Sequence, residues 1–157
     1  MALEIERKFL VKGSFQPYAI RKSRIKQGYL PTTPGCSVRI RLVDDAAWLT
    51  IKGKGNASGT TRYEWEKAID PGEAAELLDL CAGHLIDKER YLIPAGPHLF
   101  EVDVFHGINE GLVVAEIELS DENEAFERPE WLGEEVTGQK RYYNACLTTH
   151  PYKEWGL

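Results

Sequence analysis

Charged residues two positions apart recur along this chain, mostly with apolar residues between them. In a β-strand, residues two apart point to the same face, so each group would form one charged stripe on a sheet. Like charges this close repel one another unless counterions or a ligand neutralise them, so the pattern indicates a site. The seven segments are Glu4/Glu6/Lys8, Arg39/Arg41, Lys52/Lys54, Arg62/Glu64/Glu66, Lys88/Arg90, Glu101/Asp103 and Glu116/Glu118.

The same alternation, interrupted by turn residues, predicts eight strands and a few helices. Asp70 as N-cap and Pro71 in the first turn predict a helix that begins at residue 71. A short helix is expected over Glu122–Phe126 and a last one over Gln139–Leu147. The strands are expected near residues 2–11, 20–30, 36–43, 47–54, 60–69, 84–93, 98–106 and 112–120.

Eight alternating strands favour an α+β, mainly β fold: a closed eight-stranded antiparallel barrel with a few flanking helices. The ordinary arrangement would put the apolar face inside and the charges in water. We favour the reverse, because most stripes carry one sign of charge whereas solvent-exposed faces usually mix signs with neutral polar residues. The lumen would then be charged, and helices would partly cover an apolar outer surface. We expect residues 1–157 to form a single domain.

Composition narrows the class of protein. The formal net charge of −6 argues against a general nucleic-acid binder, but basic residues clustered locally could still bind an anionic substrate. Cys36, Cys81 and Cys146 are odd in number and lack C-x-x-C spacing, which favours reduced thiols in a cytoplasmic protein. No apolar run approaches the length of a membrane span, so no membrane association is expected. The oligomeric state stays open.

The basic and the acidic residues of these stripes predict binding of phosphate groups and of metal ions, respectively. The planar guanidinium group of arginine and the ammonium group of lysine both bind phosphate oxygens well. The sequence has no P-loop motif that would bind phosphate through the backbone instead. Clustered carboxylates without partner His or Cys suit hard cations such as Mg²⁺ or Mn²⁺. Together they are typical of metal-assisted phosphoryl transfer on a chain of phosphates.

The order of these motifs resembles a known family. Glu4-Ile5-Glu6-Arg7-Lys8 matches the ExExK motif that opens CYTH-domain proteins, the triphosphate tunnel metalloenzymes. The similarity spans nearly the whole chain. The further matching segments are Gln27-Gly28-Tyr29-Leu30, Arg39-x-Arg41, Lys52-x-Lys54, Glu64-x-Glu66, Lys88-x-Arg90, Glu101-x-Asp103, Glu116-x-Glu118 and residues 136–144.

The resemblance implies an eight-stranded tunnel that binds a linear triphosphate with a divalent metal. The catalytic residues expected are Lys8, Tyr29, Lys52, Glu64 and Glu66. The resemblance puts Tyr29 near the substrate, with a packing role as the alternative, and implies that Glu64 and Glu66 orient basic residues or contact a second metal. Lys140 and the helix after it resemble the segment that closes one tunnel mouth in some members. The phosphate-binding residues expected are Lys8, Arg39, Arg41, Lys52, Lys54, Arg62, Lys88, Arg90 and Lys140. The metal ligands expected are Glu4, Glu6, Glu116 and Glu118, with Asp103 as an additional ligand.

The chain resembles the short bacterial members, for which hydrolysis of inorganic tripolyphosphate to pyrophosphate and phosphate is the expected activity. An adenylate cyclase, a thiamine triphosphatase, a nucleoside or RNA triphosphatase, and a non-catalytic polyphosphate or nucleotide binder remain alternatives on the same scaffold. The general base is open between Glu64, Glu66 and a metal-bound hydroxide.

Overall fold

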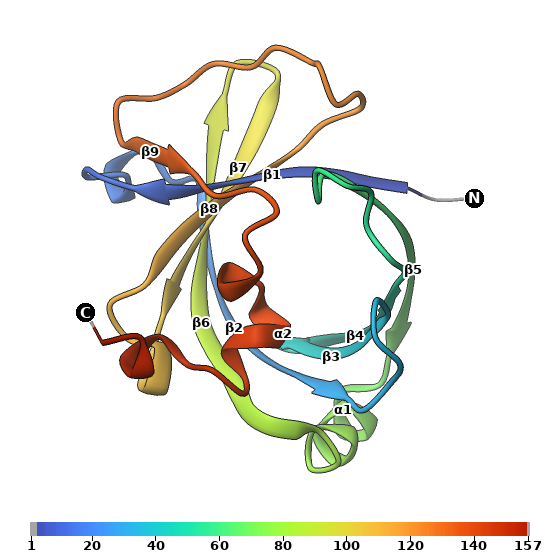
Figure 1. Cartoon of the computed structure of the whole chain (residues 1–157). Helices are drawn as coiled ribbons and strands as arrows, with labels where there is room; N and C mark the ends of the chain where they lie inside the picture. Colours follow the sequence, from blue (N-terminus) through green and yellow to red (C-terminus); the bar gives the residue numbers. More distant parts are fainter. Residues whose placement is uncertain (1–2, 157) are drawn as a thin grey trace.

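The structure, a computed structural model, describes residues 3–156, and within them nine strands form one antiparallel sheet (Figure 1). The strands are β1 (Leu3–Val11), β2 (Arg21–Leu30), β3 (Ser37–Val43), β4 (Ala46–Lys52), β5 (Thr61–Ile69), β6 (Ala82–Ala95), β7 (His98–Phe105), β8 (Val113–Glu118) and β9 (Leu132–Glu135). The helices are α1 (Pro71–Leu78) and α2 (Asn144–Leu147), with 3₁₀ turns η1 (Gln16–Tyr18), η2 (Gly107–Asn109), η3 (Lys140–Tyr142) and η4 (Tyr152–Glu154). Among these residues no helix is long and apolar enough to cross a membrane.

Eight of these strands close into a barrel, as the sequence predicts. The order β5-β4-β3-β2-β6-β7-β8-β1 is completed by pairing between β1 and β5, where Leu3 lies opposite Tyr63. Beyond that contact the same edge of β1 pairs with the extra strand β9. On its other edge β1 pairs with β8, and this register places Glu6 opposite Glu118. The charged motifs at the two ends of the sequence therefore meet on neighbouring strands.

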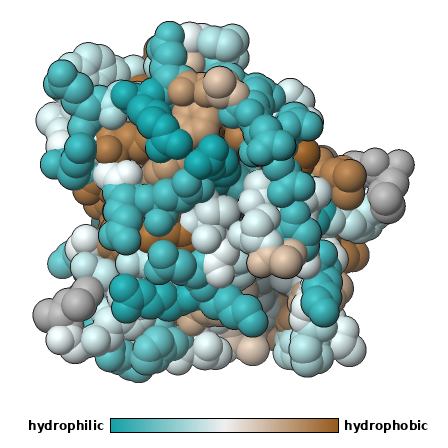
Figure 2. Space-filling model, turned by 45° about the horizontal axis from the view of Figure 1, so that its top comes forward, coloured by the Kyte–Doolittle hydropathy of each residue, from teal (hydrophilic) through white to brown (hydrophobic). Residues whose placement is uncertain are grey.

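The outer face of the barrel carries the main apolar core. Phe9, Phe100 and Ile117 alternate with inward-facing charged residues and are at most 1% exposed. The segment between β8 and β9 covers them, and Phe126 and Trp131 from this segment pack edge-to-face on Phe100. On another side, α1 packs against the outer residues of β3 and β4. Figure 2 shows that the molecular face drawn there is mostly hydrophilic, with hydrophobic side chains visible in patches.

The inward face is not charged along its whole length. Ile86, Phe105 and Val114 follow the same alternation as Lys88 and the other inward-facing residues, yet they are buried and apolar. They form a second apolar cluster with Val136, Tyr142 and Leu147 from the C-terminal segment. That segment enters this end of the barrel, where α2 is seen inside the ring of strands in Figure 1. The charged inward-facing residues therefore occupy only part of the length of the barrel. The rest of this end is filled by the second apolar cluster, which we call the apolar plug.

The predicted helices have mixed outcomes. The helix after Asp70 is confirmed: the Asp70 carboxylate accepts hydrogen bonds from the backbone N–H groups of Gly72 and Glu73. The helix over Glu122–Phe126 is wrong, because this segment makes a turn and then continues without regular secondary structure, with Phe126 packed against the core. The helix over Gln139–Leu147 is interrupted at Tyr143, whose ψ of 135° is extended, so only η3 and α2 form.

The predicted strand boundaries differ in two places that bear on the site. The fourth strand ends at Lys52, so Lys54 lies in the following loop and not on a charged stripe. Strand β9 is not predicted, because four residues with a glycine carry no clear alternation. The predicted first residue of β1, Ala2, lies outside the described residues.

Candidate functional site

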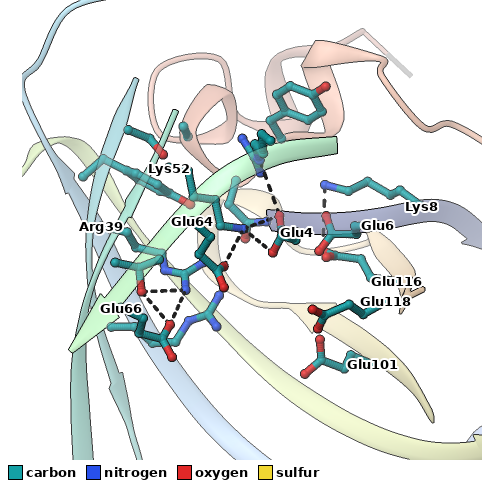
Figure 3. A pocket seen from close by; sticks show the side chains of 18 of the residues that line it. Glu4, Glu6, Lys8, Arg39, Lys52, Glu64, Glu66, Glu101, Glu116 and Glu118 are labelled. Carbon is teal, nitrogen blue, oxygen red and sulfur yellow. Dashed lines mark hydrogen bonds and ion pairs between the residues drawn. The ribbon is translucent and has the colours of Figure 1, made fainter. Parts of the chain in front are cut away.

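The barrel encloses a cavity of about 250 Å³ with walls that are almost entirely charged or polar (Figure 3). Each of the eight strands of the closed barrel brings at least one side chain to it, because inward-facing positions recur every second residue. Glu101, Thr50 and Ser37 also line it, and so do Tyr143–Ala145 of the C-terminal segment. The predicted site residues that line it are Glu4, Glu6, Lys8, Tyr29, Arg39, Arg41, Lys52, Arg62, Glu64, Glu66, Arg90, Glu116 and Glu118.

Two predicted residues lie behind the cavity wall. Lys88 and Asp103 are 0% and 1% exposed, and the Lys88 ammonium lies 2.7 Å from an Asp103 carboxylate oxygen. Asp103 also accepts a bidentate pair of hydrogen bonds from Arg90, at 2.7 and 2.9 Å. Burial acts to raise the pKa of Asp103, but Arg90 and Lys88 outweigh it and lower that pKa. Asp103 therefore orients Arg90 toward the cavity, and both oxygens of the Asp103 carboxylate are bound by Arg90 and Lys88.

Two other predicted phosphate-binding residues are not among the cavity-lining residues. Lys54 is exposed in the loop after β4, where the start of its side chain lies near Gly35. Lys140 is exposed at the start of η3. Sequence spacing places Lys54 on a stripe, but the strand has already ended there. A phosphate-binding role for either residue stays a prediction.

A buried ion-pair network links three strands at one side of the cavity. The Lys52 ammonium donates to both carboxylate oxygens of Glu4, at 2.9 and 2.8 Å, and lies 3.6 Å from Glu64. The Arg62 guanidinium approaches the same Glu4 carboxylate at 3.4 Å. Burial acts to raise the pKa of Glu4, but Lys52 and Arg62 outweigh it and keep the pKa below its ordinary value. Glu4 is therefore held as a carboxylate.

On the neighbouring wall, carboxylates are crowded with too little positive charge to balance them. Burial, reinforced by Glu116 and Glu4, raises the pKa of Glu6 well above its ordinary value. Burial together with Glu4 and Glu101 also raises the pKa of Glu118, whose carboxylate faces Glu101 in Figure 3. The nearest ammonium group, Lys8, stands 3.8 Å from Glu116. A cation bound here would relieve the repulsion that these shifts express.

The opposite wall carries two arginines with spare hydrogen-bonding capacity. Arg39 donates to the Thr50 hydroxyl at 3.1 Å, while its buried Nε has no partner. Arg41 donates from Nε to the Gln27 amide oxygen at 2.7 Å. Burial, with Arg39 and Arg90 nearby, lowers the pKa of Arg41 to about 9. Arg39 also lies 3.6 Å from the Glu66 carboxylate, so the donors without a partner on this wall are few but can bind an anion.

The C-terminal segment closes the cavity at the plugged end. Lys8 donates to the backbone carbonyl of Tyr142 at 3.3 Å, and Lys8 and Arg62 lie over the Tyr143 ring at 5.2 and 5.8 Å. Asn144 accepts a hydrogen bond of 2.9 Å from Lys88. The resemblance placed the helix after Lys140 at a tunnel mouth but did not single out Tyr143–Ala145 as lining residues, since the path of the returning chain decides their place. Thr50 could have been found, because it lies two residues before Lys52 on the same stripe.

Fold and site together define a β-barrel of the tunnel type, with ionisable side chains of both signs facing its lumen. Residues 2–149 match the model of the CYTH domain, and the chain belongs to the CYTH domain family. An inorganic triphosphatase of Acetivibrio thermocellus is 44% identical over 156 residues, which cover 99% of both chains. An inorganic triphosphatase of Nitrosomonas europaea is 40% identical over 150 residues, 92% of this chain and 95% of that protein. A crystal structure of an inorganic triphosphatase superposes with a TM-score of 0.67 at 35% identity, covering 94% of this chain and 95% of the other.

Triphosphate tunnel enzymes of this family depend on a metal in general. The carboxylates around Glu6 and Glu118 fit a hard divalent cation, because they supply oxygen donors only and their raised pKa values express uncompensated negative charge. Across residues 3–156, no three acidic, histidine or cysteine side chains are already gathered at metal-binding distances. The fit therefore rests on the chemistry of the donors.

Proposed function

We propose that this protein hydrolyses inorganic tripolyphosphate to pyrophosphate and phosphate, with Mg²⁺ or Mn²⁺. The observation that carries this proposal is that one enclosed cavity combines arginine and lysine side chains with a cluster of carboxylates around Glu6, Glu116 and Glu118 (Figure 3). A linear polyphosphate needs both, since its oxygens bind to arginine and lysine while its bound metal ions bind to carboxylates. The two relatives named inorganic triphosphatase, aligned over nearly the whole chain, support the same assignment.

In the proposed mechanism, Arg39 and Arg41 bind the phosphate oxygens from one side of the tunnel. Lys8 and Arg62 lie on the other side, next to the plug, so the chain of phosphates would be held from both sides. Cations fixed before the substrate arrives stabilise the charge that develops on the departing phosphate, because they need little reorganisation. Arg90, fixed by Asp103, would extend this set at the other end of the cavity.

Glu4, Glu6, Glu116 and Glu118 would hold the metal. When bound, Mg²⁺ or Mn²⁺ would neutralise phosphate charge and make a bound water more acidic. We assign Glu64 as the residue that accepts a proton from the attacking water. It faces the cavity, and burial together with Glu4 raises the pKa of its carboxyl group toward the range that suits a base.

One observation favours a second candidate, a phosphate ester with an organic group at one end, such as a nucleoside triphosphate. A further cavity of about 280 Å³ shares Arg41 and Arg90 with the first. Its walls add Trp48 and Leu92, together with other apolar side chains. This end of the tunnel would accept an apolar ring, whereas the plugged end would not.

We further propose that residues 1–157 act as one catalytic unit in the cytoplasm, which the three unpaired cysteines support. Phosphate release should be measured from tripolyphosphate, pyrophosphate, ATP and thiamine triphosphate, each with and without a chelator. The proposal expects release from tripolyphosphate that requires metal and is lost in Arg41→Ala. Faster turnover of ATP or thiamine triphosphate would favour the second candidate, and binding of tripolyphosphate without release would contradict hydrolysis.

A further inference from the structure

Gln27 of β2 makes two hydrogen bonds to residues that line the cavity but does not line it itself. Its side chain is 0% exposed. Its amide oxygen accepts from Arg41 Nε at 2.7 Å, and its amide nitrogen lies 3.1 Å from the Tyr29 hydroxyl oxygen. Gln27 pairs directly with Arg41 across the β2–β3 ladder, which fixes this geometry through the backbone.

The chemistry of the three groups fixes the direction of both bonds. A guanidinium group has no acceptor, so Gln27 must present its oxygen to Arg41. Its NH₂ group then faces Tyr29, and the hydroxyl oxygen of Tyr29 accepts from it. The Tyr29 O–H is thereby left to donate elsewhere, and the cavity that Tyr29 lines is the available direction.

Gln27 also differs in charge from the partners of the other tunnel cations. Lys52 is neutralised by Glu4, and Arg90 by Asp103 and Glu101. For Arg41, the described residues provide a neutral amide and no carboxylate within ion-pair distance. The arginine is therefore oriented while its positive charge stays uncompensated, which agrees with the pKa of about 9 that burial and neighbouring cations give it.

We propose that Gln27 is a positioning residue for phosphate binding, fixing Arg41 without cancelling its charge and making Tyr29 a donor into the cavity. This inference rests on the proposed function and deepens it. A carboxylate at position 27 would pair with Arg41 and would also draw the Tyr29 O–H toward itself. Both donors would then be lost to the phosphate.

The test uses the full chain and the non-hydrolysable analogue imidotriphosphate with Mg²⁺, with binding measured by calorimetry. Gln27→Met, similar in size, removes both bonds without adding charge and should weaken binding about 10-fold. Gln27→Glu should weaken binding further, because it also neutralises Arg41. Gln16→Glu is the matched control: it makes the same charge change at an exposed glutamine away from the cavity and should bind as the wild type does.

A double-mutant cycle separates positioning from a purely structural effect. In the Arg41→Ala background, Gln27→Met should weaken binding clearly less than in the wild-type background, because only the orientation of Tyr29 is then left to lose. The proposal would be overturned if the fold-changes in dissociation constant of Gln27→Met and Arg41→Ala simply multiplied in the double variant. It would also be overturned if Gln27→Glu bound the analogue as tightly as Gln27→Met does. Melting temperatures establish that each variant is folded, and Gln27→Asn replaces Gln27→Met if the latter is not.

The binding readout keeps this test separate from the proposed activity. A wild type that binds imidotriphosphate but releases no phosphate from tripolyphosphate contradicts hydrolysis and leaves the Gln27 cycle valid. A wild type that hydrolyses tripolyphosphate, with kcat and KM unchanged in Gln27→Met and Gln27→Glu, contradicts the positioning role alone.

Discussion

Lys52 of β4 and Glu4 of β1 form a bidentate ion pair inside the barrel, across the strand β5 that lies between them in the sheet. Both side chains are 9% exposed. The pair therefore reinforces from within the short β1–β5 contact that closes the barrel. The same carboxylate also receives Arg62 of β5, so all three strands converge on Glu4.

This arrangement predicts that breaking the pair from one side costs more than removing both charges. Lys52→Met should lower the free energy of unfolding by about 3 kcal/mol, because Glu4 then stays buried with only Arg62. Adding Glu4→Gln should restore a large part of that loss. Urea unfolding of the wild type, both single variants and the double variant measures the coupling, and additive effects would contradict the interpretation.

Glu118→Gln should separate activity from stability. Among the described residues, Glu118 has no ion-pair partner, and its pKa is raised by burial, Glu4 and Glu101. Removing its charge therefore relieves repulsion, and the free energy of unfolding should change by less than about 0.5 kcal/mol. Metal-dependent phosphate release should fall about 100-fold or more. Glu110→Gln, an exposed glutamate away from the cavity, is the control and should keep full activity.

Binding of a polyphosphate ligand at Arg39 and Arg41 should stabilise the folded protein. Imidotriphosphate with Mg²⁺ at 100 times its dissociation constant contributes about 2.7 kcal/mol. For a chain of this size, that corresponds to a rise in Tm of about 5–10 °C. The rise should be much smaller in Arg41→Ala and smaller still without metal, as measured by scanning calorimetry. An equal rise in the variant would place the ligand outside the tunnel.

The contact between β1 and β9 should make stability depend on pH. Arg7 donates to both carboxylate oxygens of Glu135, at 2.8 and 2.6 Å, and these bonds lower the pKa of Glu135 below its ordinary 4.5. A lowered folded-state pKa means that the stabilisation is complete well above pH 4.5 and is lost as the pH falls through the folded value. Since both side chains are partly exposed, we expect the Arg7–Glu135 pair to contribute about 0.5–1 kcal/mol to the free energy of unfolding.

Glu135→Gln should therefore be less stable than the wild type at pH 7, and the difference should shrink as the pH falls below 4.5. Urea unfolding at several pH values across this window measures it. A difference that stays constant with pH would mean that the ionisation of Glu135 does not contribute.

Alternation predicts the eight barrel strands and the charged lumen, because a period of two is a property of each strand alone. It does not predict how deep along the barrel each stripe lies. Lys88 and Asp103 occur in the same kind of stripe as Arg39 and Arg41, yet they are sealed behind the cavity wall, beside the apolar cluster of Phe105. Register between strands decides that depth, and register depends on contacts between distant parts of the chain.

The remaining errors have the same origin in long-range packing. Residues 122–126 favour a helix locally, but Phe126 packs edge-to-face on Phe9 and Phe100, and the segment there forms a turn and an irregular stretch. Asn144 carries no local signal of its place at the cavity, because that place depends on where the C-terminal segment returns. Tertiary contacts override local propensity in both segments.

The strict alternation of the barrel strands limits how this protein can change in length. In β8, Ala115 and Ile117 belong to the outer core, while Glu116 and Glu118 face the cavity. Inserting or deleting one residue within the strand would rotate every following side chain to the opposite face. Carboxylates would enter the core and apolar groups the tunnel at once. Lineages of this fold can therefore exchange residues in place within the strands, while single-residue length changes are confined to turns and bulges.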